Sequence, residues 1–190
     1  MAYRGNTLPK GDDTMTRVAT AIIAVMLAGA GTFQAQGANP LSSTMKASWT
    51  NIRDLLMRMA EKMPAEEYRF KPTPEIQDFG QRMGHAVAFI MRGCATANGS
   101  QNAVKLDPAA SKAVILAAMK TANAECDKTF DALTDADLTT MIAAGRGGQR
   151  PKMAVLQGTV LEHSQEMYGY LAVYLRLKGI VPPSSDRNER

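Results

Sequence analysis

The sequence predicts an all-α protein folded as a four-helix bundle. Four segments of roughly 20 residues place apolar side chains at helical spacing. No long segment alternates with the period of two that is typical of strands, and turn-forming residues separate the four segments. A chain of 190 residues with 45% hydrophobic and 21% charged residues suits one domain with a sizeable core. Helices of this length and number are expected to pack as a bundle.

Residues 1–38 are expected to be an N-terminal extension and a secretory signal peptide. Arg17 precedes an apolar run from Ala19 to Ala30, and small residues follow, so Ala35 and Gly37 could flank a cleavage site. The apolar run is shorter than the ~20 residues that span a bilayer as a helix, which disfavours the alternative of a permanent membrane span. The sequence therefore predicts an exported protein, either periplasmic or secreted.

The first two helices are defined by their stripes and by prolines. The first is expected from about Ser42 to Met63, because Pro64 ends it. The second is expected from about Ile76 to Ala97, after the extended segment FKPTPEI. The stripe of the first contains Met45, Ser48, Ile52, Leu55, Met59 and Lys62 or Met63, and that of the second contains Phe79, Met83, Ala86, Ile90, Cys94 and Ala97.

The third helix is expected to begin with Asp107 as N-cap and Pro108 at its first position. Its stripe contains Ile115, Met119, Ala122, Cys126, Phe130 and Leu133. Cys94 and Cys126 both lie on inward stripes, and an exported protein matures in an oxidising compartment, so we expect a disulfide between them. The bridge would stabilise the fold by roughly 3–4 kcal/mol. The alternative is a pair of buried free thiols.

The last third of the chain is expected to hold a short turn capped by Thr134, a glycine-rich loop GRGGQR, and a fourth helix opened by Pro151. The inward stripe of this helix is Met153, Leu156, Val160, His163, Met167, Tyr170, Tyr174 and Leu177. Gly179 and the pair of prolines after it end the helix. The bundle is thus expected over 39–185, with a disordered tail at 186–190.

Composition and motifs exclude several functions. The net charge of +4 comes from charges spread along the chain without a basic block, so no nucleic acid is expected as a partner. No G-x-S-x-G element, phosphate-binding glycine loop or cysteine beside a histidine occurs, so catalytic residues stay unassigned. The two histidines, His85 and His163, are candidates for the bundle interior, where facing helices can build metal sites. From spacing alone, two satisfied core histidines are the favoured alternative.

Three phrases resemble the DinB-like four-helix bundle proteins, in an exported subgroup. They are FKPTPE before the second helix, FGQRMGHAVAFIMRGC within it, and YLAVYLRLKGIVPPSS at the end of the fourth. The resemblance covers about Asn39 to Ser185. It implies a bundle in which one histidine of helix two and an H-x-x-x-H pair of helix four bind a divalent metal such as zinc or nickel. It also favours a homodimer.

The chain departs from that pattern at its third ligand. His85 and His163 match the family's histidines, but Met167 replaces the second histidine of the pair, and Tyr170 stands where a glutamine often follows the glycine, here Gly169. A thioether is a poor ligand for zinc. Three outcomes stay open: metal is lost or weakly bound, Glu166 supplies a carboxylate for zinc or nickel, or a soft His-His-Met set binds copper, which is the least favoured.

The resemblance implies two classes of function. One is a noncatalytic binding or stress-associated protein that keeps the bundle and its cavity with a degenerate metal site, and this class is favoured. The other is a metal-dependent thiol transferase or isomerase-like enzyme, in which a metal lowers the pKa of a bound thiol or water. In both classes the small-molecule partner is unknown, and the family resemblance suggests a thiol.

Overall fold

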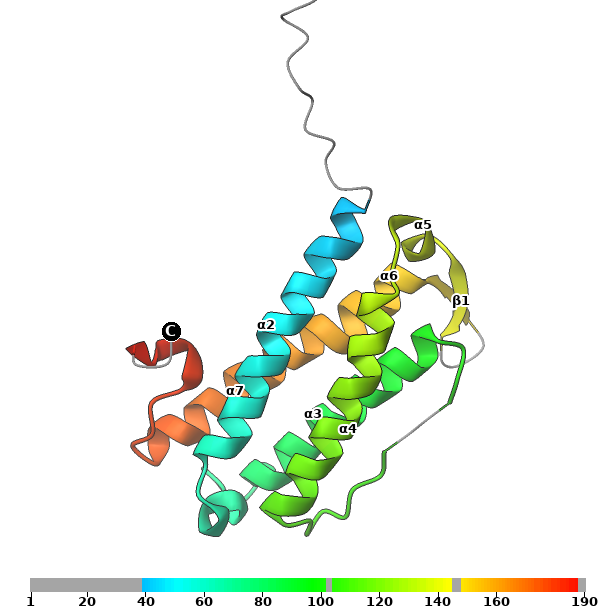
Figure 1. Cartoon of the computed structure of the whole chain (residues 1–190). Helices are drawn as coiled ribbons and strands as arrows, with labels where there is room; N and C mark the ends of the chain where they lie inside the picture. The colour runs from blue at the N-terminus through cyan, green and yellow to red at the C-terminus, as the bar shows by residue number, and fades with distance from the viewer. Residues whose placement is uncertain (1–38, 102–103, 145–147, 188–190) are drawn as a thin grey trace, which may run out of the picture. The chain divides into compact units, whose positions relative to one another are not determined.

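The computed structural model describes residues 39–101, 104–144 and 148–187, and four long helices dominate this part of the chain (Figure 1). They are α2 (Pro40–Lys62), α3 (Phe79–Ala97), α4 (Lys112–Asp131) and a fourth composite helix. The fourth consists of α6 (Lys152–Val155), a π-helical segment η2 (Leu156–Glu162) and α7 (His163–Leu177). Short elements connect them: η1 (Ala65–Arg69), α5 (Asp135–Leu138) and η3 (Pro183–Ser185). The predicted all-α bundle is confirmed.

The four helices form a ring in the order α2, α4, α3, α7. The packed neighbours are α2 with α4, α4 with α3, α3 with α7, and α7 with α2. The η2 segment also packs against α3 and α2. Each helix therefore buries one face against two others, which is the arrangement that an amphipathic stripe requires.

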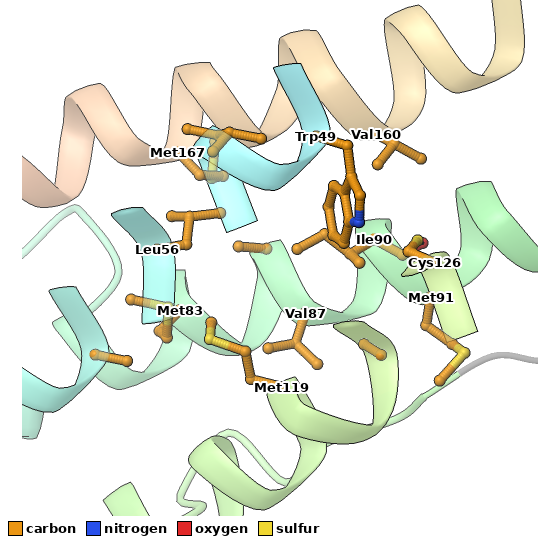
Figure 2. Packing of buried hydrophobic residues seen from close by; sticks show 14 of the residues in the cluster. Trp49, Leu56, Met83, Val87, Ile90, Met91, Met119, Cys126, Val160 and Met167 are labelled. Carbon is orange, nitrogen blue, oxygen red and sulfur yellow. The ribbon is translucent and has the colours of Figure 1, made fainter. Parts of the chain in front are cut away.

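The buried positions largely follow the predicted stripes, and Figure 2 shows the methionine-rich centre of the core. Every predicted stripe residue of α3, from Phe79 to Ala97, is buried, and so is the whole predicted set of α4. In α2 the inward positions are Trp49 and Leu56 rather than their predicted neighbours Ser48 and Leu55, which are only partly buried. The indole of Trp49 stacks on Phe130 of α4 with ring centres 5.5 Å apart.

The predicted disulfide is present between Cys94 of α3 and Cys126 of α4. The two Cα atoms lie 5.3 Å apart and both side chains are fully buried. The Cα separation is within the usual range for a bridge, so the α3–α4 contact needs no distortion to accommodate it.

Two helix starts differ from the prediction. A capping box between Asp78 and Gln81 begins α3 three residues later than expected. Helix α4 begins at Lys112 with Ser111 as N-cap, so the predicted start at Asp107 is wrong. The Asp107 carboxylate instead accepts from the backbone N–H of Ala109 at 2.7 Å, which closes a local turn. The cap at Thr134 is confirmed, with Asp137 completing the box.

The π-helical segment changes the inward face of the fourth helix. Leu156, Val160, Met167 and Tyr174 are buried as predicted, but Tyr170 and Leu177, which follow the π segment, are 47% and 57% exposed. Met153, which precedes the segment, is 45% exposed. The side chains of Ser164, Leu171 and Leu175 are buried in their stead. A π turn holds more residues than an α turn, so the stripe after it is rotated relative to an uninterrupted α-helix.

Two strands that the sequence did not predict pair around the predicted glycine-rich loop. Strand β1 (Met141–Ala144) pairs antiparallel with β2 (Gly148–Pro151), and Met141 faces Pro151. Each strand has four residues, and neither MIAA nor GQRP alternates apolar with polar residues, so the sequence did not identify them.

The predicted signal peptide and cleavage site lie outside the described residues. The predicted disordered tail starts at Asp186, whose carboxylate lies 2.8 Å from the amine of Lys62, and 188–190 are outside the described part. Within 39–101, 104–144 and 148–187, no helix combines the length and apolar character needed to cross a bilayer.

Candidate metal and ligand site

The two histidines of the chain lie side by side across the α3–α7 contact. His85 projects from α3 and His163 is the first residue of α7, and their ring centres are 5.1 Å apart. Phe89, one turn after His85, packs against both rings, at 4.5 Å from His85 and 4.0 Å from His163. The three rings form one cluster at the edge of the bundle interior.

Close packing of η2 on α3 sets the position of His163. Gly93 of α3 has no side chain, and a Cβ atom there would overlap Val160 and press on Thr159 at 3.2 Å. The backbones can therefore approach closely at this level. The α-helix resumes at His163 directly after the π segment, which places the imidazole opposite His85.

The carboxylate of Glu166 forms a hydrogen bond with one ring nitrogen of His163. The Nδ1 atom of His163 lies 3.0 Å from Oε2 of Glu166. In the neutral tautomer that donates from Nδ1 to the carboxylate, Nε2 carries a lone pair. Among the described residues, Nε2 of His163 is buried and has no hydrogen-bond partner. This arrangement is typical of metal-binding histidines, whose second nitrogen is held by a carboxylate.

Met167 is part of the hydrophobic core. Its side chain is 2% exposed, and Figure 2 shows it among the buried residues with Leu56 and Trp49. The structure thus brings His85, His163 and Glu166 together and assigns Met167 a packing role. Glu162, which lies nearby in sequence, accepts a hydrogen bond at 3.2 Å through its Oε1 atom from Nε2 of Gln157.

Two arginines flank the histidine pair, and sequence reasoning missed both. Arg82 lies over the ring of Tyr170, with Cζ 4.9 Å from the ring centre. Arg92 lies over Phe89 at 3.8 Å. A signal for them exists in the sequence, because positions 82, 85, 89 and 92 recur on one face of a helix.

The surroundings of His85 disfavour its protonation. Burial lowers the pKa of the His85 imidazole below its usual value. The neighbouring His163 and the positive charges of Arg82 and Arg92 act in the same direction, and Glu166 opposes them. His85 is therefore neutral at pH 7, the form that can bind a metal.

A cavity of about 400 Å³ adjoins His85 on the side away from α7. It is bounded by α3 and by the segment from Val104 to Pro108, and the small residues Gly80, Gly84 and Ala88 leave room along α3. A cavity of this size can hold a small molecule.

The donors present fit a metal ion only in part. Two imidazoles on one tetrahedral ion have ring centres roughly 5 Å apart, and the observed separation of 5.1 Å agrees. The unpartnered Nε2 of His163 is a suitable donor. However, the described residues contain no group of three or more His, Cys, Asp or Glu side chains that could hold a metal ion. A two-imidazole site is expected to bind zinc or nickel weakly.

Comparisons with known proteins agree with the fold. The model of the DinB superfamily matches residues 48–171. A DinB-like protein from Bacillus cereus is 20% identical with a TM-score of 0.62, covering 73% of this chain and 93% of its own. A DinB-like protein from Bacillus subtilis is 19% identical with a TM-score of 0.57, covering 72% and 92%.

A conserved protein from Enterococcus faecalis is 11% identical with a TM-score of 0.55, covering 72% of this chain and 98% of its own. At these identities the likeness concerns the fold alone. No curated protein matches the sequence.

Proposed function

Because the chain belongs to the DinB superfamily, we propose that it is an exported, noncatalytic binding protein with a weak divalent-metal site. The observation that carries this proposal is the state of His163. Its Nε2 atom is buried without a partner beside the ring of His85, while Met167 lies in the core. The site thus offers two nitrogen donors and lacks a third.

In this proposal His85 and His163 would hold zinc or nickel, and Glu166 would orient His163 through its 3.0 Å hydrogen bond. A bound metal would supply Lewis-acid activation of a thiol or a water. Two protein donors hold such an ion too weakly for an efficient catalytic site, which usually has three. This shortage of donors favours a binding or stress-associated role over catalysis.

A metal-dependent thiol transferase or isomerase-like enzyme is the second candidate. The cavity beside His85 favours it, because a substrate of small size, such as a thiol, could reach the imidazole from that side. In such an enzyme Glu166 would supply a further ligand for the metal.

Calorimetry on chelator-treated protein tests the metal site. Zinc and nickel should bind to the wild type with dissociation constants that are roughly micromolar or weaker, and His163→Ala should show no binding. Tight stoichiometric zinc, together with metal-dependent consumption of a low-molecular-weight thiol, would instead establish the enzyme. Absence of zinc and nickel binding in the wild type would contradict the weak site.

Export is supported by the buried Cys94–Cys126 bridge, since disulfides form mainly in oxidising compartments. Mass spectrometry of protein recovered from outside the cytoplasm should show an N-terminus near Ala38, with the apolar run removed. An intact N-terminus upstream of residue 30 would refute the cleavage. A homodimer is an expectation from the family, and light scattering tests it.

A further inference from the structure

The histidine pair lies in the middle of a face that carries an excess of positive charge. On α3 this face consists of Arg82, His85, Phe89 and Arg92, and on α7 of His163, Glu166 and Tyr170. We call it the arginine–histidine face. Its members recur every three or four residues on both helices, so each set lies along one side of its helix.

Both guanidinium groups of this face stack on aromatic rings. Arg82 lies over Tyr170 and Arg92 lies over Phe89. A stacked guanidinium keeps its in-plane N–H groups available, and these match the oxygens of a carboxylate or phosphate. Stacking also limits the motion of the side chain, so less conformational entropy is lost when an anion binds.

Neither arginine pairs with a carboxylate of the described residues, unlike two arginines elsewhere in the bundle. Arg53 contacts Asp127 at 2.7 Å, and Arg69 contacts Asp78 at 3.3 Å. In contrast, Arg82 lies over the ring of Tyr170, and its Nε atom is buried without a hydrogen-bond partner within the described chain. A buried charged donor without an acceptor is costly, and an incoming anion would relieve that cost.

The face has one carboxylate close to the histidines, and that group is already engaged. Glu166 accepts from Nδ1 of His163. The positive charges of the two guanidiniums outnumber the negative charge of this single carboxylate. A field of this sign attracts anions and opposes a bare divalent cation.

We propose that the arginine–histidine face binds a small oxyanion group, the carboxylate or phosphate of a soluble molecule, beside the histidine rings that Arg82 and Arg92 flank. The guanidinium N–H groups donate to the anion, and the exposed part of Tyr170 provides an apolar contact for the rest of the ligand. The anion binds to metal-free protein in this proposal. A failure of anion binding and a failure of metal binding can therefore be distinguished.

The test uses metal-free protein from which the chelator has been removed, at constant ionic strength. Succinate and inorganic phosphate serve as probes, titrated separately. The chain contains two histidines in all, so the ring signals in NMR spectra report on this face alone. Saturable shifts of these signals by at least one probe are expected for the wild type, and the probe that shifts them identifies the source of the oxyanion.

The double variant Arg82→Gln/Arg92→Gln should weaken this binding about ten-fold or more. A double variant with the same loss of charge, Arg150→Gln/Arg176→Gln, is the matched control and should bind like the wild type, because both side chains are exposed on β2 and on α7 away from the face. The single variants provide a check if the double variant folds poorly. No saturable shift with either probe, or equal affinity in both double variants, would overturn the proposal.

Discussion

His85 on α3 and His163 on α7 bring their ring centres to 5.1 Å of each other, with Phe89 packed against both. The contact depends on the π-helical segment that precedes His163 and on the absence of a side chain at Gly93. It joins two residues that are far apart in the sequence, and it creates the position where a metal ion or an anion would bind.

The first prediction concerns the missing third donor. Met167→His should raise zinc affinity about ten-fold to a thousand-fold, because a nitrogen donor contributing roughly 1.4–4 kcal/mol would stand one turn after His163. The change should also lower the free energy of unfolding by about 1–3 kcal/mol, because Met167 is 2% exposed in an apolar core. Calorimetry and urea unfolding measure the two effects.

The control for this experiment is His85→Ala in the Met167→His background. It should abolish the gain in zinc affinity, since the remaining imidazoles would come from α7 alone. Equal zinc affinity in the wild type and in Met167→His would show that residue 167 cannot supply a third ligand to the metal.

The second prediction distinguishes two roles of Glu166. If Glu166 orients His163, Glu166→Gln should keep most of the metal affinity, because the amide oxygen can still accept from Nδ1, whereas Glu166→Ala should lose about ten-fold to a hundred-fold. We expect this pattern. Equal, large losses of zinc affinity in both variants would show that the carboxylate itself binds the ion.

The third prediction concerns the Cys94–Cys126 bridge between α3 and α4. Reduction should lower the melting temperature by roughly 10 °C, because the bridge limits the entropy of the unfolded chain. Thermal unfolding followed by circular dichroism measures the change. The double variant Cys94→Ala/Cys126→Ala should melt near the reduced protein and should not respond to reductant; an identical melting curve before and after reduction would argue against the bridge.

The fourth prediction concerns the close approach of α3 and η2. Gly93→Ala should destabilise the protein by about 1–3 kcal/mol, since the added methyl group would overlap Val160 and press on Thr159. It should also disturb the NMR signals of His163, whose position follows from this packing. Urea unfolding measures the stability change.

Gly169→Ala is the matched control for that variant. Gly169 is also helical, but an added Cβ would meet no atom within 4 Å. The free energy of unfolding of the Gly169→Ala protein should stay the same or rise by up to roughly 1 kcal/mol, because alanine favours the helix over glycine. If the Gly93→Ala protein has the same free energy of unfolding as the Gly169→Ala protein, α3 and η2 can move apart without loss of stability.

Local features of the fold were predictable from the sequence because they depend on neighbouring residues. The stripe from Phe79 to Ala97 identified the inward face of α3, and the Thr134 cap marked the start of α5. The bridge followed from the inward positions of Cys94 and Cys126. Periodicity and caps act within one or two turns, so a single sequence carries their signal.

Long-range packing decided the rest. The ring order of the helices and the π turn after Val155 depend on contacts such as that of Gly93 with Val160, which no local pattern records. That turn exposed Tyr170 where the periodicity predicted burial, and it left Tyr170 free to stack under Arg82. The sequence by itself determined the helices, the core faces of α3 and α4, and two candidate histidines. Only the tertiary structure decided which side chains surround those histidines, because that depends on how the helix faces meet in space.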